Sequence, residues 1–159
     1  MSWRGSNTIS DRIFACLPYL LPVIEVFEFG RFLLAQFPPL QVIFLPLIPL
    51  LKIYYGVRFA GIIIFFALFF LVIRNEKISH FVRFNTMQAI LLDIVIFLFS
   101  ILTDFVGLVP AGGFAIQTLS TTIFLGILGA VVYSIAQSLM GRYAEIPAIS
   151  DAVYMQLPR

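Results

Sequence analysis

Charged residues are scarce in this sequence, and their scarcity indicates the class of protein. Only 11% of the 159 residues are charged and 61% are hydrophobic, proportions far from those of soluble domains. The ten cations and eight anions are spread in ones and twos, so the chain has no basic tract of the kind that binds nucleic acid. We expect an integral membrane protein with a single transmembrane domain, residues 1–159, and no nucleic-acid partner.

Cysteine and histidine are almost absent as well. Cys16 has no second cysteine with which to form a disulfide, and His80 cannot build a metal site by itself. The sequence contains no nucleophile elbow, phosphate-binding loop or zinc-protease motif. Asp93 and Asp104 share a predicted helix, but eleven residues separate them by about 16 Å, which is too far for a catalytic dyad. We expect no enzyme activity, no metal and no cofactor.

The first apolar run is not expected to be a cleavable leader. Pro18 and Pro22 interrupt the first apolar run, and no small-residue cleavage site follows it. The polar residues before this run number about ten, too few for an organellar transit peptide. We expect this region to be part of the mature protein.

Long apolar runs predict an all-α polytopic fold with four transmembrane helices. A helix needs about 20 apolar residues to cross the hydrocarbon layer. The prolines at positions 18 and 22 are expected to bend the first span. The predicted spans are residues 11–36, 57–73, 85–103 and 114–140.

The segment between the first two spans is interrupted by proline. Residues 38–55 contain four prolines, and the clean helix they leave would be about 18 Å long, too short to span. We predict an interfacial or re-entrant hydrophobic segment. The tail, residues 142–159, is polar and is expected at the surface.

The distribution of cations along the chain predicts which side of the membrane holds the two termini. With four spans, seven of the ten cations fall on the side that holds both termini. By the positive-inside rule this side is cytoplasmic, or stromal in a plastid.

Few polar side chains lie within the predicted spans. Glu25 and Glu28 share one side of the first helix, with Arg31 three residues further on. They are either an interfacial ion pair near the helix end or the lining of a wet cavity. A hypothetical polar seam that offers partners to a passing peptide would consist of Glu25, Glu28, Gln88, Asp93 and Gln117.

The third span carries polar residues on one face. Asp93 shares this face with Thr86, Ala89, Ser100 and Asp104. A buried aspartate is costly in a membrane, so it either fixes helix packing or lies on a substrate or ion path.

The fourth span carries small residues at every fourth position. Such a ridge lets a neighbouring backbone approach closely, within the chain or in an oligomer. The predicted packing residues are Thr118, Thr122, Gly126, Ala130, Ser134 and Ser138.

The run from Ile78 to Ile94, with the Leu17-Pro-Tyr-Leu-Leu-Pro segment and Phe29-Gly30 upstream, resembles a known family. The chain is similar over residues 11–143 to the small four-span subunit of Tic, the chloroplast inner-envelope protein translocon, and to its cyanobacterial homologues. The specific motif residues are His80, Arg83, Phe84, Asn85, Met87 and Gln88.

The resemblance implies a four-helix protein with both termini cytoplasmic or stromal. It also implies a subunit proposed to form a preprotein-conducting channel with other Tic subunits, without catalytic residues. The expected partners are the lipid bilayer, other membrane subunits or further copies of the chain, and translocating preproteins. The expected location is the cyanobacterial plasma or thylakoid membrane, or the plastid inner envelope.

Two other functions remain open at the level of the sequence. One is a structural or assembly subunit of a larger membrane complex, such as a photosynthetic one. The other is a small-solute carrier, for which inverted internal repeats would be expected, and none is clear here.

Overall fold

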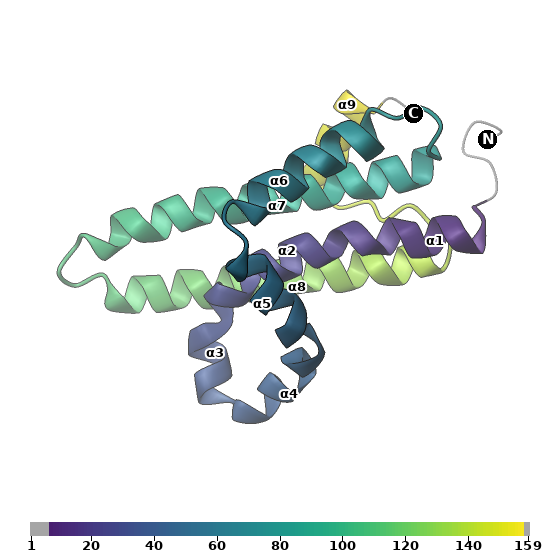
Figure 1. Ribbon diagram of the computed structural model, residues 1–159. Helices are drawn as coiled ribbons and strands as arrows, with labels where there is room; N and C mark the ends of the chain where they lie inside the picture. The colour runs from purple at the N-terminus through teal and green to yellow at the C-terminus, as the bar shows by residue number, and fades with distance from the viewer. Residues whose placement is uncertain (1–6, 158–159) are drawn as a thin grey trace.

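Two long helices form the frame of the molecule. The structure is a computed structural model that describes residues 7–157, and within this range it contains helices and no strand. Helices α7 (His80–Gly107) and α8 (Gly113–Leu139) run antiparallel as a hairpin (Figure 1). At 28 residues, α7 is about 42 Å long and exceeds the ~30 Å hydrocarbon layer. The predicted all-α polytopic membrane fold is confirmed.

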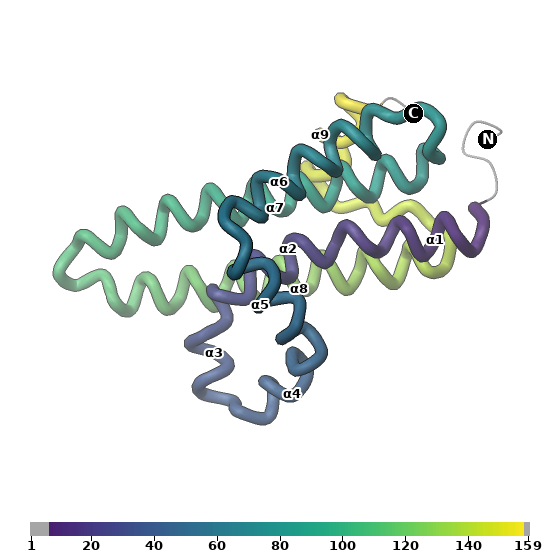
Figure 2. The backbone as a smooth tube through the Cα atoms, in the orientation of Figure 1, coloured from purple at the N-terminus to yellow at the C-terminus, as the bar shows by residue number. Residues whose placement is uncertain are grey.

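The amino-terminal part lies along this hairpin as one bent helix, Ile9–Gln36. Pro18 lies in the first of its two 3-10 turns, because proline supplies no backbone N–H and disturbs the α-helical pattern. The segments are α1 (Ile9–Cys16), η2 (Leu17–Tyr19), α2 (Leu20–Val26), η3 (Phe27–Gly30) and α3 (Arg31–Gln36). The 3-10 turn at Pro18 interrupts the α-helical pattern, whereas the clear change of direction in Figure 2 comes later, between α2 and α3.

Residues 38–56 form a curl of short helices that leaves the bundle (Figure 2). Proline lies at the start of both 3-10 turns and of the last helix, so the curvature follows from the sequence. Leu51 is the one buried residue of this segment. The elements are η4 (Pro38–Leu40), α4 (Gln41–Phe44), η5 (Leu45–Leu47) and α5 (Ile48–Gly56).

The next segment is shorter than predicted. It consists of α6 (Ala60–Leu68) and a π-helical continuation, η6 (Phe69–Ile73), which together reach only about 21 Å. Among the described residues, four helices are long and apolar enough to cross a membrane. Pro38–Gly56 is one of these four, and the predicted span 57–73 is not. The curl is the shape expected of a re-entrant segment, and the choice of second crossing stays a prediction.

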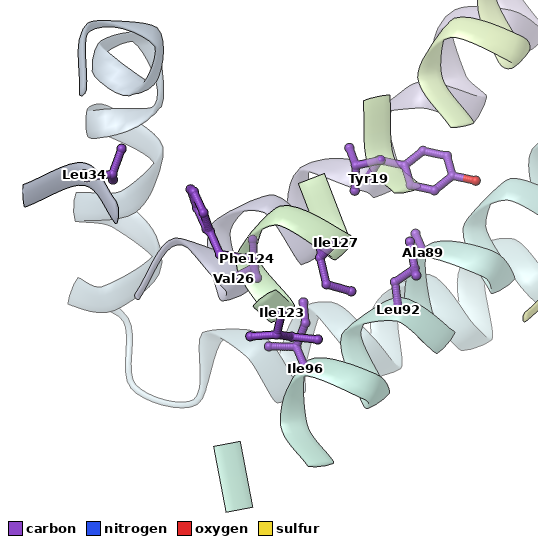
Figure 3. Packing of buried hydrophobic residues seen from close by; sticks show 10 residues of the cluster. Tyr19, Val26, Leu34, Ala89, Leu92, Ile96, Ile123, Phe124 and Ile127 are labelled. Carbon is purple, nitrogen blue, oxygen red and sulfur yellow. The ribbon is translucent and has the colours of Figure 1, made fainter. Parts of the chain in front are cut away.

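The main core lies where the first helix meets α7 and α8. Ile123 and Ile127 of α8 pack with Leu92 and Ile96 of α7 in this cluster (Figure 3). Phe124 is 1% exposed and its ring lies 5.8 Å from that of Phe44, centroid to centroid. This contact attaches the curl to the bundle.

The described part of the tail folds back onto the bundle and buries one side there, while its other side is exposed. Gly141 has a φ of +75°, and the N–H of Arg142 donates to the carbonyl of Gln137 at 2.9 Å, a glycine-dependent helix ending. Helix α9 (Ile149–Gln156) then packs on α7, and its Val153 is fully buried.

The small-residue ridge on α8 does not stay on one face. Ser134 and Ser138 are buried, whereas Thr118, Thr122 and Gly126 are exposed. Four residues turn a helix by about 400°, so a four-residue repeat drifts by about 40° per step. Only the carboxyl-terminal half of the predicted ridge therefore packs within the described part of the chain.

One end of the molecule collects most of the described cations. The start of α1, the start of α7, the end of α8 and α9 all lie at this end, opposite the α7–α8 turn (Figure 1). We call it the basic end. It includes Arg12, Arg74, Lys77, Arg83 and Arg142, and the side of the membrane it faces stays a prediction.

Substitution of Gly30 tests the packing of the main core. A Cβ at this position would lie 2.5 Å from the buried ring of Phe124, so Gly30→Ala should destabilise the fold by about 1–3 kcal/mol. The matched control is Gly126→Ala, whose Cβ meets no atom within 4 Å and which should cost nothing. Thermal unfolding midpoints in the same detergent measure both, and equal midpoints would contradict the packing described here.

Candidate functional site

The motif residue Gln88 is the centre of a buried polar network. Its Nε2 donates to the hydroxyl of Tyr19 at 3.0 Å and the backbone carbonyl of Ala144 at 2.9 Å, and lies 3.3 Å from Oγ of Ser134. Its Oε1 accepts a hydrogen bond from Ser150 at 2.8 Å. One side chain of α7 thus holds the first helix, α8 and the tail together.

Asn85 completes the network one turn earlier on α7. Its Oδ1 accepts from the hydroxyls of Tyr19 at 2.8 Å and Ser138 at 3.0 Å. Its Nδ2 donates to the carbonyl of Phe81 at 2.9 Å. Asn85, Gln88 and Tyr19 are all 0% exposed, so every bond forms in a medium of low dielectric, where a satisfied network is strong.

The other motif residues fasten neighbouring segments to the same junction. Arg83 donates from Nε to the carbonyl of Ile73 at 2.8 Å, where it neutralises the exposed carbonyl end of η6. His80 Nδ1 lies 2.9 Å from the hydroxyl of Tyr143. Phe84 and Met87 pack in the hydrophobic cluster that includes Val153 and Leu157 of the tail.

The motif therefore has a structural explanation in every position. Gln88 faces protein on all sides, whereas the seam hypothesis placed it on a surface open to a peptide. Sequence reasoning missed the partners Tyr19, Ala144 and Ser150. Tyr19 lies in the Leu17-Pro-Tyr segment that carries the resemblance, but no spacing rule links it to positions 66 and 69 residues away.

Two carboxylates of the predicted seam do lie near each other. Glu25 is within electrostatic range of Asp93 and Glu28, and its Oε1 lies against Gly61 of α6. Asp93 is partly buried, and its Oδ1 has no hydrogen-bond partner among residues 7–157. Gln117 is partly buried on α8. Across the described chain, no three His, Cys, Asp or Glu side chains are grouped to hold a metal ion.

A polar groove of about 950 Å³ lies between the curl and the α7–α8 hairpin. We call it the hairpin groove. Its apolar walls are mainly Phe27, Phe44, Leu45 and Ile48. Its polar lining brings together side chains from five elements, η3, α3, α4, α7 and α8: Glu28, Arg31, Gln41, Ser100, Thr103, Asp104 and Ser120.

Two of the first-helix charges lie at the hairpin groove, and the choice between their two interpretations stays a prediction. Glu28 and Arg31 both line it, and the structure forms no ion pair between them in the part of the chain it describes. The guanidinium of Arg31 instead lies 4.8 Å from the ring centre of Phe32. Ser100 and Asp104, predicted to share a face with Asp93, also line this groove.

Comparison with known proteins covers the residues that form this junction. Residues 9–153 match the family described as Chloroplast import apparatus Tic20-like. The chain belongs to the Tic20 family. The match begins at the first residue of α1 and ends within α9, so it includes the whole buried junction.

Individual relatives come from cyanobacteria and plastids. A Tic20 family protein of Synechocystis is 51% identical over 148 residues, 92% of each chain. Protein TIC 20-II, chloroplastic, of Arabidopsis thaliana is 35% identical over 99% of this chain and 78% of its own. The Tic20 family protein Ycf60 of Porphyra purpurea is 33% identical, over 97% and 79%.

The network makes Gln88 a sensitive position for stability. Gln88→Leu removes four contacts and leaves Tyr19 and Ser150 short of a partner, so we expect a loss of about 2–3 kcal/mol. Unfolding in detergent measures this loss, with Gln137→Leu on α8 as the control because the side chain of Gln137 forms no hydrogen bond within residues 7–157. Limited proteolysis should cut the tail of the Gln88 variant first, and an equally protected tail would contradict the junction.

Proposed function

We propose that this Tic20 family chain is a non-enzymatic membrane subunit of a Tic-type protein translocon, and that its hairpin groove receives the translocating polypeptide. The observation that supports the proposal is the mixed lining of the groove. An unfolded polypeptide in a membrane needs partners for its backbone N–H and C=O groups, which lipid cannot supply. Glu28, Asp104 and Arg31 offer both signs of charge, and hydroxyl and amide groups lie among apolar walls.

The position of the groove fits this role. It lies against the last part of α7, near the α7–α8 turn and away from the basic end. If the basic end is cytoplasmic or stromal, as the positive-inside rule predicts, the groove opens towards the compartment from which a preprotein would be imported. The groove is open at its side, so a closed path requires other subunits or a second copy of the chain.

A structural or assembly subunit is the second candidate function. The exposed half of the α8 ridge supports it, because a methyl group added at Gly126, or at the nearby Gly129, would meet no atom within 4 Å. A helix of a partner could approach this face closely. Under this alternative the hairpin groove would be covered by a stable partner rather than visited by passing chains.

Site-specific crosslinking separates these functions. A photoreactive amino acid at Thr103, which lines the groove, should capture an arrested preprotein in membranes that carry out import. The control position is Leu102, the neighbouring residue, which is 44% exposed and does not line the groove. Capture of one constant membrane protein at Thr103, with or without preprotein, would favour the assembly function, and equal preprotein capture at both positions would contradict a groove path.

A further inference from the structure

A second groove, of about 580 Å³, lies between the first helix and α6. We call it the apolar groove. The first helix and α6–η6 both pack on α7 but leave a space between them, with Val82 and Thr86 of α7 at its floor. Nothing in the proposed function uses this space.

The walls of the apolar groove exclude a polar occupant. They consist of aliphatic and aromatic side chains, among them Leu20, Leu21, Ile64 and Leu68. The one hydroxyl at the floor, Thr86 Oγ1, already donates to the carbonyl of Val82 at 2.8 Å. A polypeptide backbone would find no partner here and would bear the cost of unsatisfied amides. A hydrocarbon chain carries no such cost.

Charged groups occur at one end of this groove only. Asp11, Lys77 and Ser79 line its mouth at the basic end, and the Lys77 ammonium forms no ion pair within residues 7–157. The mouth thus offers a cation, a carboxylate and a hydroxyl. This arrangement matches a zwitterionic head group that is neutral overall, with an anionic phosphate facing Lys77 and a cationic group facing Asp11.

The groove extends from the basic end past the middle of the hydrocarbon layer. From Asp11 to Ile24 the wall formed by the first helix extends about 20 Å, roughly two thirds of the ~30 Å hydrocarbon layer. The walls along this length are apolar and suit a hydrocarbon chain, which needs no hydrogen-bond partner.

We propose that the apolar groove is a lipid-binding site. It holds an acyl chain of a glycerolipid from the leaflet at the basic end, and the head group lies between Asp11 and Lys77. The bound lipid fills the space between the first helix and α6 and so completes the packing of both on α7.

The test measures lipid retained by the purified full-length chain. The protein is reconstituted in vesicles of dioleoyl phosphatidylcholine, extracted in mild detergent and examined by native mass spectrometry. Ile64→Trp fills the groove, and Ile63→Trp is the matched control because Ile63 is 57% exposed and does not line it. Wild type and control should retain a bound lipid, and Ile64→Trp should retain about tenfold less. Equal retention by both variants, or none by wild type, would overturn the site.

A second measurement does not depend on the stability of a filled groove. A photoreactive amino acid at Ile64 in the otherwise unchanged chain should form a covalent lipid adduct in the same vesicles. A crosslinked dimer, or an adduct with another protein in native membranes, would instead identify a helix as the occupant and overturn the proposal. Vesicles of phosphatidylglycerol test the head group, because stronger retention of this anionic lipid would contradict the neutral assignment.

Discussion

The fold depends on one constraint, that polar groups inside a membrane protein must find partners within the protein. Gln88 and Asn85 of α7 satisfy it by bonding to the first helix, α8 and the tail at once. An amide left without partners in this position would cost several kcal/mol. The network therefore holds the segments in one relative position, which apolar packing alone specifies less strictly.

The polar side chains of the chain accordingly gather in two regions of different character. At the basic end the polar side chains of the network are buried and satisfied by one another. Near the hairpin turn the polar side chains, among them Glu28, Arg31 and Asp104, line an open groove and lack protein partners for their charges in the described structure. The first region is rigid by construction, and the second is available to another molecule.

The family motif belongs to the rigid region. Its residues anchor η6, α9 and the first helix on α7, so its role in this chain is architectural. The proposed peptide path lies about three turns or more further along α7, outside the motif. Relatives could thus share the junction while the groove adapts to different partners, and the apolar groove would serve the same junction by supplying a lipid where protein packing is incomplete.

The sequence by itself determined the membrane class, the apolar helices, the break in the α-helical pattern at Pro18 and the family, because each follows from local composition or from a contiguous motif. It also placed Ser100 and Asp104 on one helix face. Only the tertiary structure decided that Gln88 is buried, that the α8 ridge is half exposed, and that one side of the tail packs on α7. The partners of Gln88 come from positions 46 to 69 residues away. Helical periodicity specifies which residues share a face, but not which segment covers that face, and this choice belongs to the packing of the whole chain.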